Sequence, residues 1–355
     1  MDQYAHANLA SLYLQQKKYD DAQKEYQTAI KITPNDFNLN IGLGTADLGL
    51  HQDDAALAAF HVVLEKAPSP VTWNNVAFYL ADNNSHLDVA EQYSENSIRA
   101  IEAQLNGASL DTVGPTQAGL VQTIATFWDT MGWIKFKQGN MAAAESYIRS
   151  AWFISDDATV GDHLGQIYEK EGRRDDAIHT YALALDCPRP PVETHGRLAA
   201  LVSEKKVEAE KDKVRPDLAS RRAITLPNPQ KIDADAEFWV LLSSSVPAAA
   251  ATASVNAKFI AVDDDFTSKQ GSGASPQHEP AREKNDKLAG TFRDYTAALS
   301  AAKFPYVFPQ GESGKILLRG ILACDTLRQP TCSFMPFPAD RTVRLSLAPG
   351  PAVSQ

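Results

Sequence analysis

A pattern of small and aromatic residues recurs every 34 residues in the first part of the chain. In its first copy Ala10 and Ala22 are the small residues, Tyr26 is the aromatic residue, and Pro34 closes the segment. Shifted by one period, the matching positions hold Gly44, Ala56, Phe60 and Pro68. An internal repeat of this length constrains the whole architecture, because each copy must stack on its neighbours to bury its apolar face.

Three further copies follow, and the third has Ser94 where the aromatic residue of the second helix is expected. In chain order the five copies span about residues 3–36, 37–70, 71–104, 125–157 and 158–191. The pattern resembles the tetratricopeptide repeat, a helix–turn–helix unit in which small residues let the helices approach and aromatic residues fill the space between repeats. The resemblance implies an all-α solenoid. Ordinary amphipathic helices are the alternative.

About twenty extra residues, near 101–124, separate the third and fourth copies. The stretch IRAIEAQL predicts an extension of the helix before it, and QAGLVQTIA predicts an extension of the helix after it. NGASLDTVGP between them is typical of a loop punctuated by Gly and Pro. We expect the solenoid to be interrupted or bent here; the alternative is a tolerated surface insertion.

The solenoid and its cap are predicted to occupy residues 1–222. After the fifth copy, a helix that begins behind prolines has Leu198 and Leu201 on its inner side, which is typical of a capping helix. The segment 205–222 is dense in charge of both signs. Such interleaving favours a solvated helix face over a nucleic-acid site.

The second part of the chain has a different periodicity. Residues 223–231 are predicted to be a linker before an α+β domain at 232–346. Runs rich in aromatic and β-branched residues predict strands at 236–243, 256–263, 315–324 and 331–337. Helical spacing places Leu288, Phe292, Tyr295 and Leu299 on one face, so we expect one helix packed on an antiparallel sheet. Residues 266–283 have the composition of a disordered segment, and residues 347–355 form a tail.

The second part also resembles the C-terminal region of bacterial envelope proteins that carry transglutaminase-like domains ahead of their repeats. The stretches AEFWVLL, KFPYVFP and RGILAC followed by CSFMPFP carry this resemblance. It implies an alternative function, in which the chain is the accessory or C-terminal part of an envelope hydrolase or transglutaminase-like system. The catalytic domain of that system is not in this chain.

The net charge of −10 comes from 34 basic and 44 acidic residues, and it is unevenly distributed. Residues 1–190 hold 13 Lys and Arg against 25 Asp and Glu, a charge of −12, which leaves +2 for the remainder. Binding to a phosphate backbone needs clusters of Lys and Arg. We therefore expect no nucleic-acid partner for the repeats.

The distribution of apolar residues predicts neither a membrane span nor a signal peptide. No run of 18 or more apolar residues occurs, so the sequence predicts no membrane span. The first twenty residues lack a basic region followed by an apolar run, so no signal peptide is predicted. The default expectation is a cytoplasmic protein, or one of the cell envelope if this sequence is an N-terminally truncated fragment.

The sequence predicts neither catalysis nor a cofactor or metal site. The motifs H-E-x-x-H and G-x-S-x-G are absent, and so is any pair of C-x-x-C motifs. Asp47 stands where a dinucleotide-binding loop would need Gly. The stretch GESGK at 311–315 lacks the Gly and the Ser/Thr of a phosphate loop, because Pro309 and Ile316 occupy those positions. Asp263–Asp265 fit a charged strand end better than a calcium site.

Cys324 and Cys332 lie at the facing ends of the hairpin predicted from strands 315–324 and 331–337. In an oxidising compartment they would form a disulfide, which stabilises the hairpin by roughly 2–3 kcal/mol in the loop-entropy model. In the cytosol both would stay reduced. The sequence leaves these alternatives open.

The first helix of each repeat lines the concave face, where such solenoids usually bind partners. Counting along the repeats, the predicted lining residues are Asn38, Asn74, Phe78, Asp129, Trp133, Lys137, Asp162 and Gln166. An acidic-to-neutral groove with exposed aromatic residues predicts a protein or peptide partner with apolar and basic side chains. The alternative is that the chain's own second half covers the groove. We expect a non-enzymatic interaction scaffold.

Overall fold

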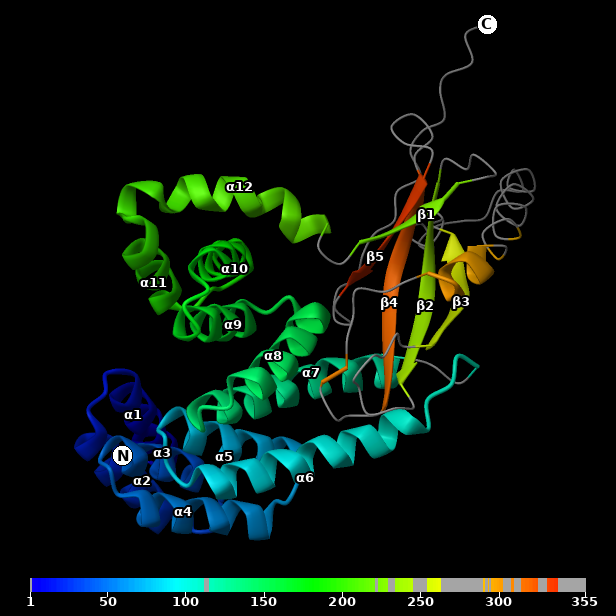
Figure 1. The fold of residues 1–355 in the computed structure, drawn as a ribbon. Helices are drawn as coiled ribbons and strands as arrows, with labels where there is room; N and C mark the ends of the chain where they lie inside the picture. Colours follow the sequence, from blue (N-terminus) through cyan, green and yellow to red (C-terminus); the bar gives the residue numbers. More distant parts are fainter. Residues whose placement is uncertain are drawn as a thin grey trace, which may run out of the picture. The chain divides into compact units, whose positions relative to one another are not determined.

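The computed structural model shows a helical array followed by an antiparallel sheet (Figure 1). It describes residues 2–111, 115–220, 223–228, 234–244, 254–262, 290, 293, 295–302, 308–309, 314–324 and 331–337. The chain divides into two compact units. Unit 1 comprises Met1–Ile101 and Thr126–Ile148, and unit 2 comprises Glu102–Ala125 and Arg149–Gln355.

Successive helices form antiparallel pairs, as the 34-residue pattern predicts. The helices that contribute to unit 1 are α1 (Gln3–Gln15), α2 (Tyr19–Ile32), α3 (Leu39–Gly49), α4 (Asp53–Lys66), α5 (Pro70–Asp82), α6 (Leu87–Asn106), α7 (Pro115–Lys137) and α8 (Met141–Ser155). The last three of these also contribute to unit 2. The predicted fold class, an all-α repeat array with an α+β region after it, is confirmed.

Small residues set how closely the paired helices approach. A Cβ atom added at Gly44 would lie 2.5 Å from Cε1 of Phe60, and one added at Gly165 would lie 2.3 Å from Cε1 of Tyr181. Distances this short leave no room for a side chain. The glycines of IGLGTADLG therefore serve helix packing, as the sequence predicts, and Phe60 is fully buried in the core of unit 1.

The turns inside the helix pairs share a backbone feature. Each turn has a residue with positive φ, in chain order Lys17, His51, Asn84, Gly139 and Gly172, and the third turn has a second one, His86. The left-handed region reverses the chain within a few residues, and glycine adopts it without steric cost. The first three turns adopt it with larger residues.

The extra residues between the third and fourth repeats lengthen the helices on both sides. Helix α6 continues to Asn106 and α7 begins at Pro115, so both predicted extensions are confirmed. Residues 107–111 follow α6 without regular structure, and residues 112–114 lie outside the described part of the chain.

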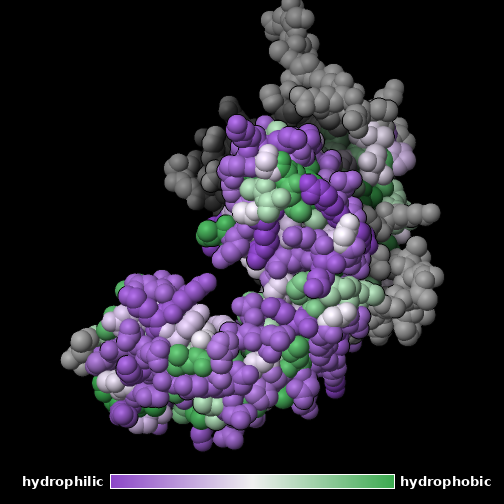
Figure 2. All heavy atoms as spheres, turned by 60° about the vertical axis from the view of Figure 1, so that its left-hand side comes forward, coloured by the Kyte–Doolittle hydropathy of each residue, from purple (hydrophilic) through white to green (hydrophobic). Residues whose placement is uncertain are grey.

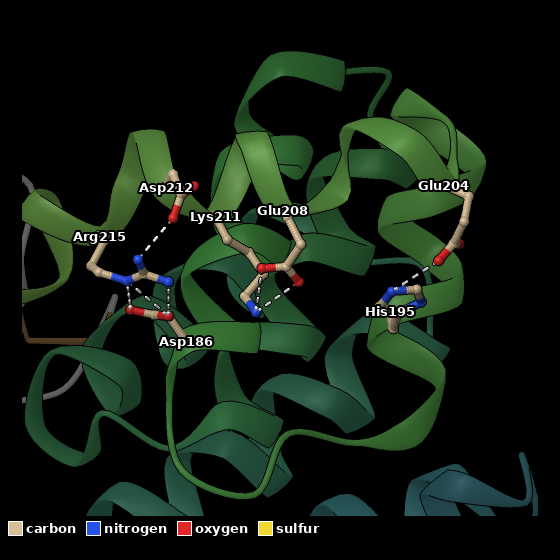
Figure 3. A network of polar contacts seen from close by, with 7 residues as sticks. All are labelled: Asp186, His195, Glu204, Glu208, Lys211, Asp212 and Arg215. Atoms are coloured by element: carbon tan, nitrogen blue, oxygen red, sulfur yellow. Dashed lines mark hydrogen bonds and ion pairs between the residues drawn. The ribbon is translucent and has the colours of Figure 1, made fainter.

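Unit 2 contains a further helix pair and a cap. Its helices are α9 (Ala158–Lys170), α10 (Arg174–Asp186), α11 (Val192–Val202), the short η1 (Glu204–Lys206) and α12 (Val207–Ser220). Leu198 of α11 is fully buried, in keeping with the predicted capping helix. Most charged side chains of α12 pair with neighbours, as Arg215 does with Asp186 and Asp212 (Figure 3).

The sheet of unit 2 has five antiparallel strands among the described residues, in the order β1-β5-β4-β2-β3. These are β1 (Ile224–Pro227), β2 (Ala234–Ser244), β3 (Ser254–Val262), β4 (Gly314–Cys324) and β5 (Thr331–Phe337). One face buries Phe238, Leu322 and Phe334. Residues 295–300 are helical, as predicted, and bury Tyr295 and Leu299.

The predicted linker at 223–231 is wrong in its first part. Ile224–Pro227 forms β1, which pairs with β5, and both Ile224 and Leu226 are buried. Two inward residues suffice for a short edge strand, and Pro227 is tolerated because an edge position need not donate to a second neighbour. The predicted disordered segment 266–283 and the tail 347–355 lie outside the described residues.

Candidate peptide-binding surface

The predicted groove residues lie in both units. In unit 1, Asn38 directly precedes α3, and the other members belong to α5 and α7. In chain order those are Asn74, Phe78, Asp129, Trp133 and Lys137. Asp162 and Gln166 belong to α9 in unit 2.

Aromatic side chains from α5 and α7 pack on the same core in unit 1. Phe78, Tyr79, Trp133 and Phe136, called the aromatic cluster here, all join the core that contains Leu80 and Ile134. The rings of Trp133 and Phe136 stack with centroids 5.0 Å apart, and those of Phe78 and Tyr79 meet edge to face at 6.1 Å. The structure thus brings together two of the predicted contacts, Phe78 and Trp133.

Trp133 is a core residue, which corrects the expectation of an exposed aromatic at this position. Only 5% of its surface is exposed, and its indole Nε1 donates to Oδ1 of Asp82 at 3.3 Å. Lys137 Nζ lies 4.7 Å from the Trp133 ring centroid and donates to the carbonyl of Asp82 at 3.4 Å. Phe78 and Lys137 are half-buried.

Sequence reasoning missed Asp82, which is exposed and ends α5. It follows Phe78 by four residues, so both lie on one face of the helix. The four-residue spacing from Phe78, a predicted contact, is the sequence feature that could have indicated Asp82. Asp82 adds negative charge at the edge of the aromatic cluster.

The polar members of the predicted set differ in accessibility. Asn38 is exposed, whereas Asn74 and Asp129 are 3% and 8% exposed. Asn74 Oδ1 has no hydrogen-bond partner among the described residues. A buried amide oxygen in this state is uncommon in folded proteins. Asn74 and Asp129 are therefore interior residues beneath the surface.

Lys135 is committed to the neighbouring helix. Its ammonium pairs with the Glu91 carboxylate of α6, and Gln138 Nε2 donates to Glu91 at 2.7 Å. Burial alone would raise the pKa of Glu91, but the hydrogen bonds and the charge of Lys135 outweigh it and lower that pKa. This arrangement joins α6 to α7, whereas the contacts of Lys137 join α5 to α7.

Asp162 binds residues of the capping helix. Its carboxylate accepts from Thr194 Oγ1 at 2.7 Å, from Arg197 Nη1 at 2.6 Å and from Gln166 Nε2 at 2.8 Å, and Asp162 is 3% exposed. Helix α11 covers the face that another repeat would cover. The capacity of Asp162 to accept hydrogen bonds is therefore used inside unit 2.

Three other observations bear on chemistry. Within the described residues, no group of three or more His, Cys, Asp or Glu side chains is arranged to hold a metal ion. No described helix is both long enough and apolar enough to cross a membrane. Cys324 and Cys332 are cross-strand partners joined by a disulfide, whose presence in the protein's own compartment stays a prediction.

Exposed apolar side chains do not mark a partner site by themselves. The face shown in Figure 2 is largely hydrophilic, with apolar residues in separate patches. In the described part of the chain, the large apolar residues that are exposed are Tyr4, Leu12, Ile32, Val62, Val71 and Val192. They are spread over α1, α2, α4, α5 and α11, and single exposed apolar residues are normal.

Comparisons with known proteins identify the repeats. The tetratricopeptide repeat matches residues 3–36 and again residues 162–191. A thermophilic tetratricopeptide-repeat protein of Thermus thermophilus is 18% identical and matches 56% of this chain and 98% of its own, with a TM-score of 0.42. PilF of Pseudomonas aeruginosa is 15% identical over 61% of this chain and 92% of its own, with a TM-score of 0.38.

Yeast Tom70 is also similar, at 18% identity over 62% of this chain and 43% of its own, with a TM-score of 0.39. A comparison with curated proteins found no match. The link to envelope proteins with transglutaminase-like domains stays a prediction. The matched segments are the first and the fifth of the predicted repeats, so the chain contains tetratricopeptide repeats at these positions.

Proposed function

We propose that the chain is a non-enzymatic scaffold that binds a protein or peptide on the surface carried by α5 and α7. Stacked helix pairs expose their first helices side by side, and repeat proteins use such surfaces for binding. The observation that supports this site most is the aromatic cluster, which combines Phe78 from one repeat with Trp133 and Phe136 from the next. Asp82 and Lys137 add charge at its edge.

The proposed partner presents an apolar side chain next to a basic one. The half-buried ring of Phe78 offers an apolar contact, and the exposed carboxylate of Asp82 offers an acceptor one helical turn away. The charge of −12 on residues 1–190 favours a basic partner over an acidic one. The same charge argues against nucleic acid.

A panel of labelled peptides tests this proposal. The peptides share one apolar sequence and carry Lys, Gln or Glu at the flanking positions, and fluorescence anisotropy measures their dissociation constants. We expect the Lys peptide to bind most tightly. In Asp82→Asn the side-chain oxygen still accepts from Trp133, but the charge is lost, so affinity for the Lys peptide should fall about threefold and affinity for the Gln peptide should not change.

Matched variants on other helices serve as controls. Asp88→Asn removes an exposed carboxylate from α6, and Val62→Ser removes an exposed apolar side chain from α4. Neither should alter binding, whereas Phe78→Ser should weaken all three peptides. Equal affinities for the Lys and Glu peptides would contradict the proposed partner chemistry. An unchanged affinity in Phe78→Ser would contradict the site.

A further inference from the structure

The end of α6 leaves backbone carbonyls that need partners. The last four carbonyls of a helix have no donor within the helix, and they carry the partial negative charge of the helix C-terminus. Helix α6 ends at Asn106, and the described residues 107–111 that follow form no regular structure. Ala108 is nevertheless only 4% exposed, and Leu105 is 1% exposed. The side chains of Leu105 and Ala108 are therefore covered by other residues.

Two lysines of the sheet donate to carbonyls of this segment, of which that of Asn106 belongs to the helix. Lys315 Nζ, at the start of β4, donates to the carbonyls of Asn106 at 3.0 Å and Ala108 at 3.2 Å. Lys258 Nζ, on β3, donates to the carbonyl of Leu110 at 2.7 Å. An ammonium group offers three donors and favours the negative end of a helix. The residues joined by these hydrogen bonds are separated by 148 or more positions in the sequence.

Strand register places both lysines on one face of the sheet. Trp239 of β2 is the cross-strand partner of Lys258 and also of Arg319, and Lys315 is four residues before Arg319 on β4. Alternation along a strand therefore puts all of them on the same face. This is the face opposite the one that buries Phe238.

The sheet face that carries Lys258 and Lys315 is buried close to Lys315. Leu317 lies two residues after Lys315 and is 2% exposed, and its cross-strand partner Leu241 is 8% exposed. Further along the face, Ile321 and Met335 are half-buried. Close to Lys315 the face is thus covered, and the lysine contacts put residues 106–110 there. Figure 1 shows the end of α6 next to the ends of β2 and β4.

We propose that the end of α6 and the residues that follow it, 106–110, are the docking site for the chain's own C-terminal sheet, and that Lys258 and Lys315 fasten the sheet to it. The inference explains why the repeat array departs from its period at this point. Lengthening α6 places the carbonyls of Asn106, Ala108 and Leu110 where the sheet presents its two lysines. It does not depend on peptide binding at α5 and α7.

Hydrogen exchange of the full-length protein tests the docking. In the double variant Lys258→Met/Lys315→Met, we expect amides of residues 105–111 and of the first half of β4 to exchange about tenfold faster than in the wild type. Amides at the β4–β5 end, around Ile321–Cys324, should keep their protection and so report an intact sheet. The control variant Lys31→Met/Lys66→Met removes exposed lysines from the last turns of α2 and α4.

A second variant tests the same contact from the helix side. Ala108→Asp places a charge at a buried position, and it should raise exchange in the first half of β4 as the lysine variant does. Unchanged exchange at 105–111 in the lysine variant would overturn the proposal. So would a loss of protection throughout the sheet, because the lysines would then stabilise the sheet itself instead of its docking.

Discussion

Single small residues determine whether paired helices can approach. Gly165 of α9 faces the ring of Tyr181, whereas a Cβ atom at Gly196 of α11 would meet nothing within 4 Å. Gly165→Ala should lower the free energy of unfolding by about 2–3 kcal/mol, because the added methyl group overpacks the contact. Gly196→Ala should raise it by up to about 1 kcal/mol, because alanine favours helix.

Urea unfolding of both glycine variants gives the comparison. The substitution is chemically the same in each, so opposite signs isolate the effect of packing. Destabilisation of similar size at both positions would contradict the close contact between α9 and α10.

Ser94 illustrates how a departure from the repeat pattern affects stability. It is fully buried in α6, and its Oγ has no hydrogen-bond partner among the described residues. A buried hydroxyl without a partner costs free energy, so Ser94→Ala should raise the free energy of unfolding by about 1 kcal/mol. Ser97→Ala is the matched control, since Ser97 Oγ donates to the carbonyl of Tyr93 at 2.7 Å and its loss should not stabilise the protein.

At the scale of helices, the pairing of Asp162 with Arg197 holds the cap on the last repeat. The Asp162 side chain is 4% exposed and that of Arg197 is 32% exposed. Arg197→Met leaves a buried carboxylate without its cation and should cost about 2–3 kcal/mol of unfolding free energy. Asp162→Asn in the same background should recover most of that loss. If Arg197→Met has no effect on urea unfolding, the pairing does not hold the cap.

The helix pair α9–α10 should make the protein sensitive to alkaline pH. Burial, with the hydrogen bond to Glu169 and its charge, raises the pKa of Tyr181 above its ordinary value near 10. The folded state therefore keeps the phenol protonated, so its stabilising effect is complete below about pH 10 and is lost as the pH rises further. The slope should approach about 1.4 kcal/mol per pH unit.

Tyr181→Phe isolates this contribution. Its free energy of unfolding, measured in urea at several pH values from neutral to above about 10, should fall less steeply than that of the wild type. Tyr4→Phe, at a residue that is 70% exposed, should keep the wild-type slope. Parallel curves for Tyr181→Phe and the wild type would show that Tyr181 does not titrate as the structure implies.

The helices and most strands could be predicted because their periodicity is local. The inward side chains of α1–α10 repeat in sequence, and strands β2–β5 contain several residues of the expected type. Side-chain accessibility could not be predicted in the same way. Trp133 and Asp162 stand at lining positions, but each is buried and hydrogen-bonded to a residue of another helix. Strand β1 has only two inward residues beside prolines, too few to show a period.

At the scale of the whole molecule, the negative charge is concentrated in the repeats. Residues 1–190 carry −12 of charge, and the remainder carries +2. Asp82 brings part of that charge to the aromatic cluster. The charge distribution and the proposed site thus favour the same partner, an apolar and basic peptide.

Site-specific photo-cross-linking tests the central claim most directly. A benzophenone amino acid is placed at residue 78 on α5 or at residue 62 on α4, and the labelled Lys peptide is added. We expect cross-linking from position 78 that an unlabelled Lys peptide suppresses, with none from position 62. Cross-linking from position 62 alone, or equally from both positions, would contradict the claim.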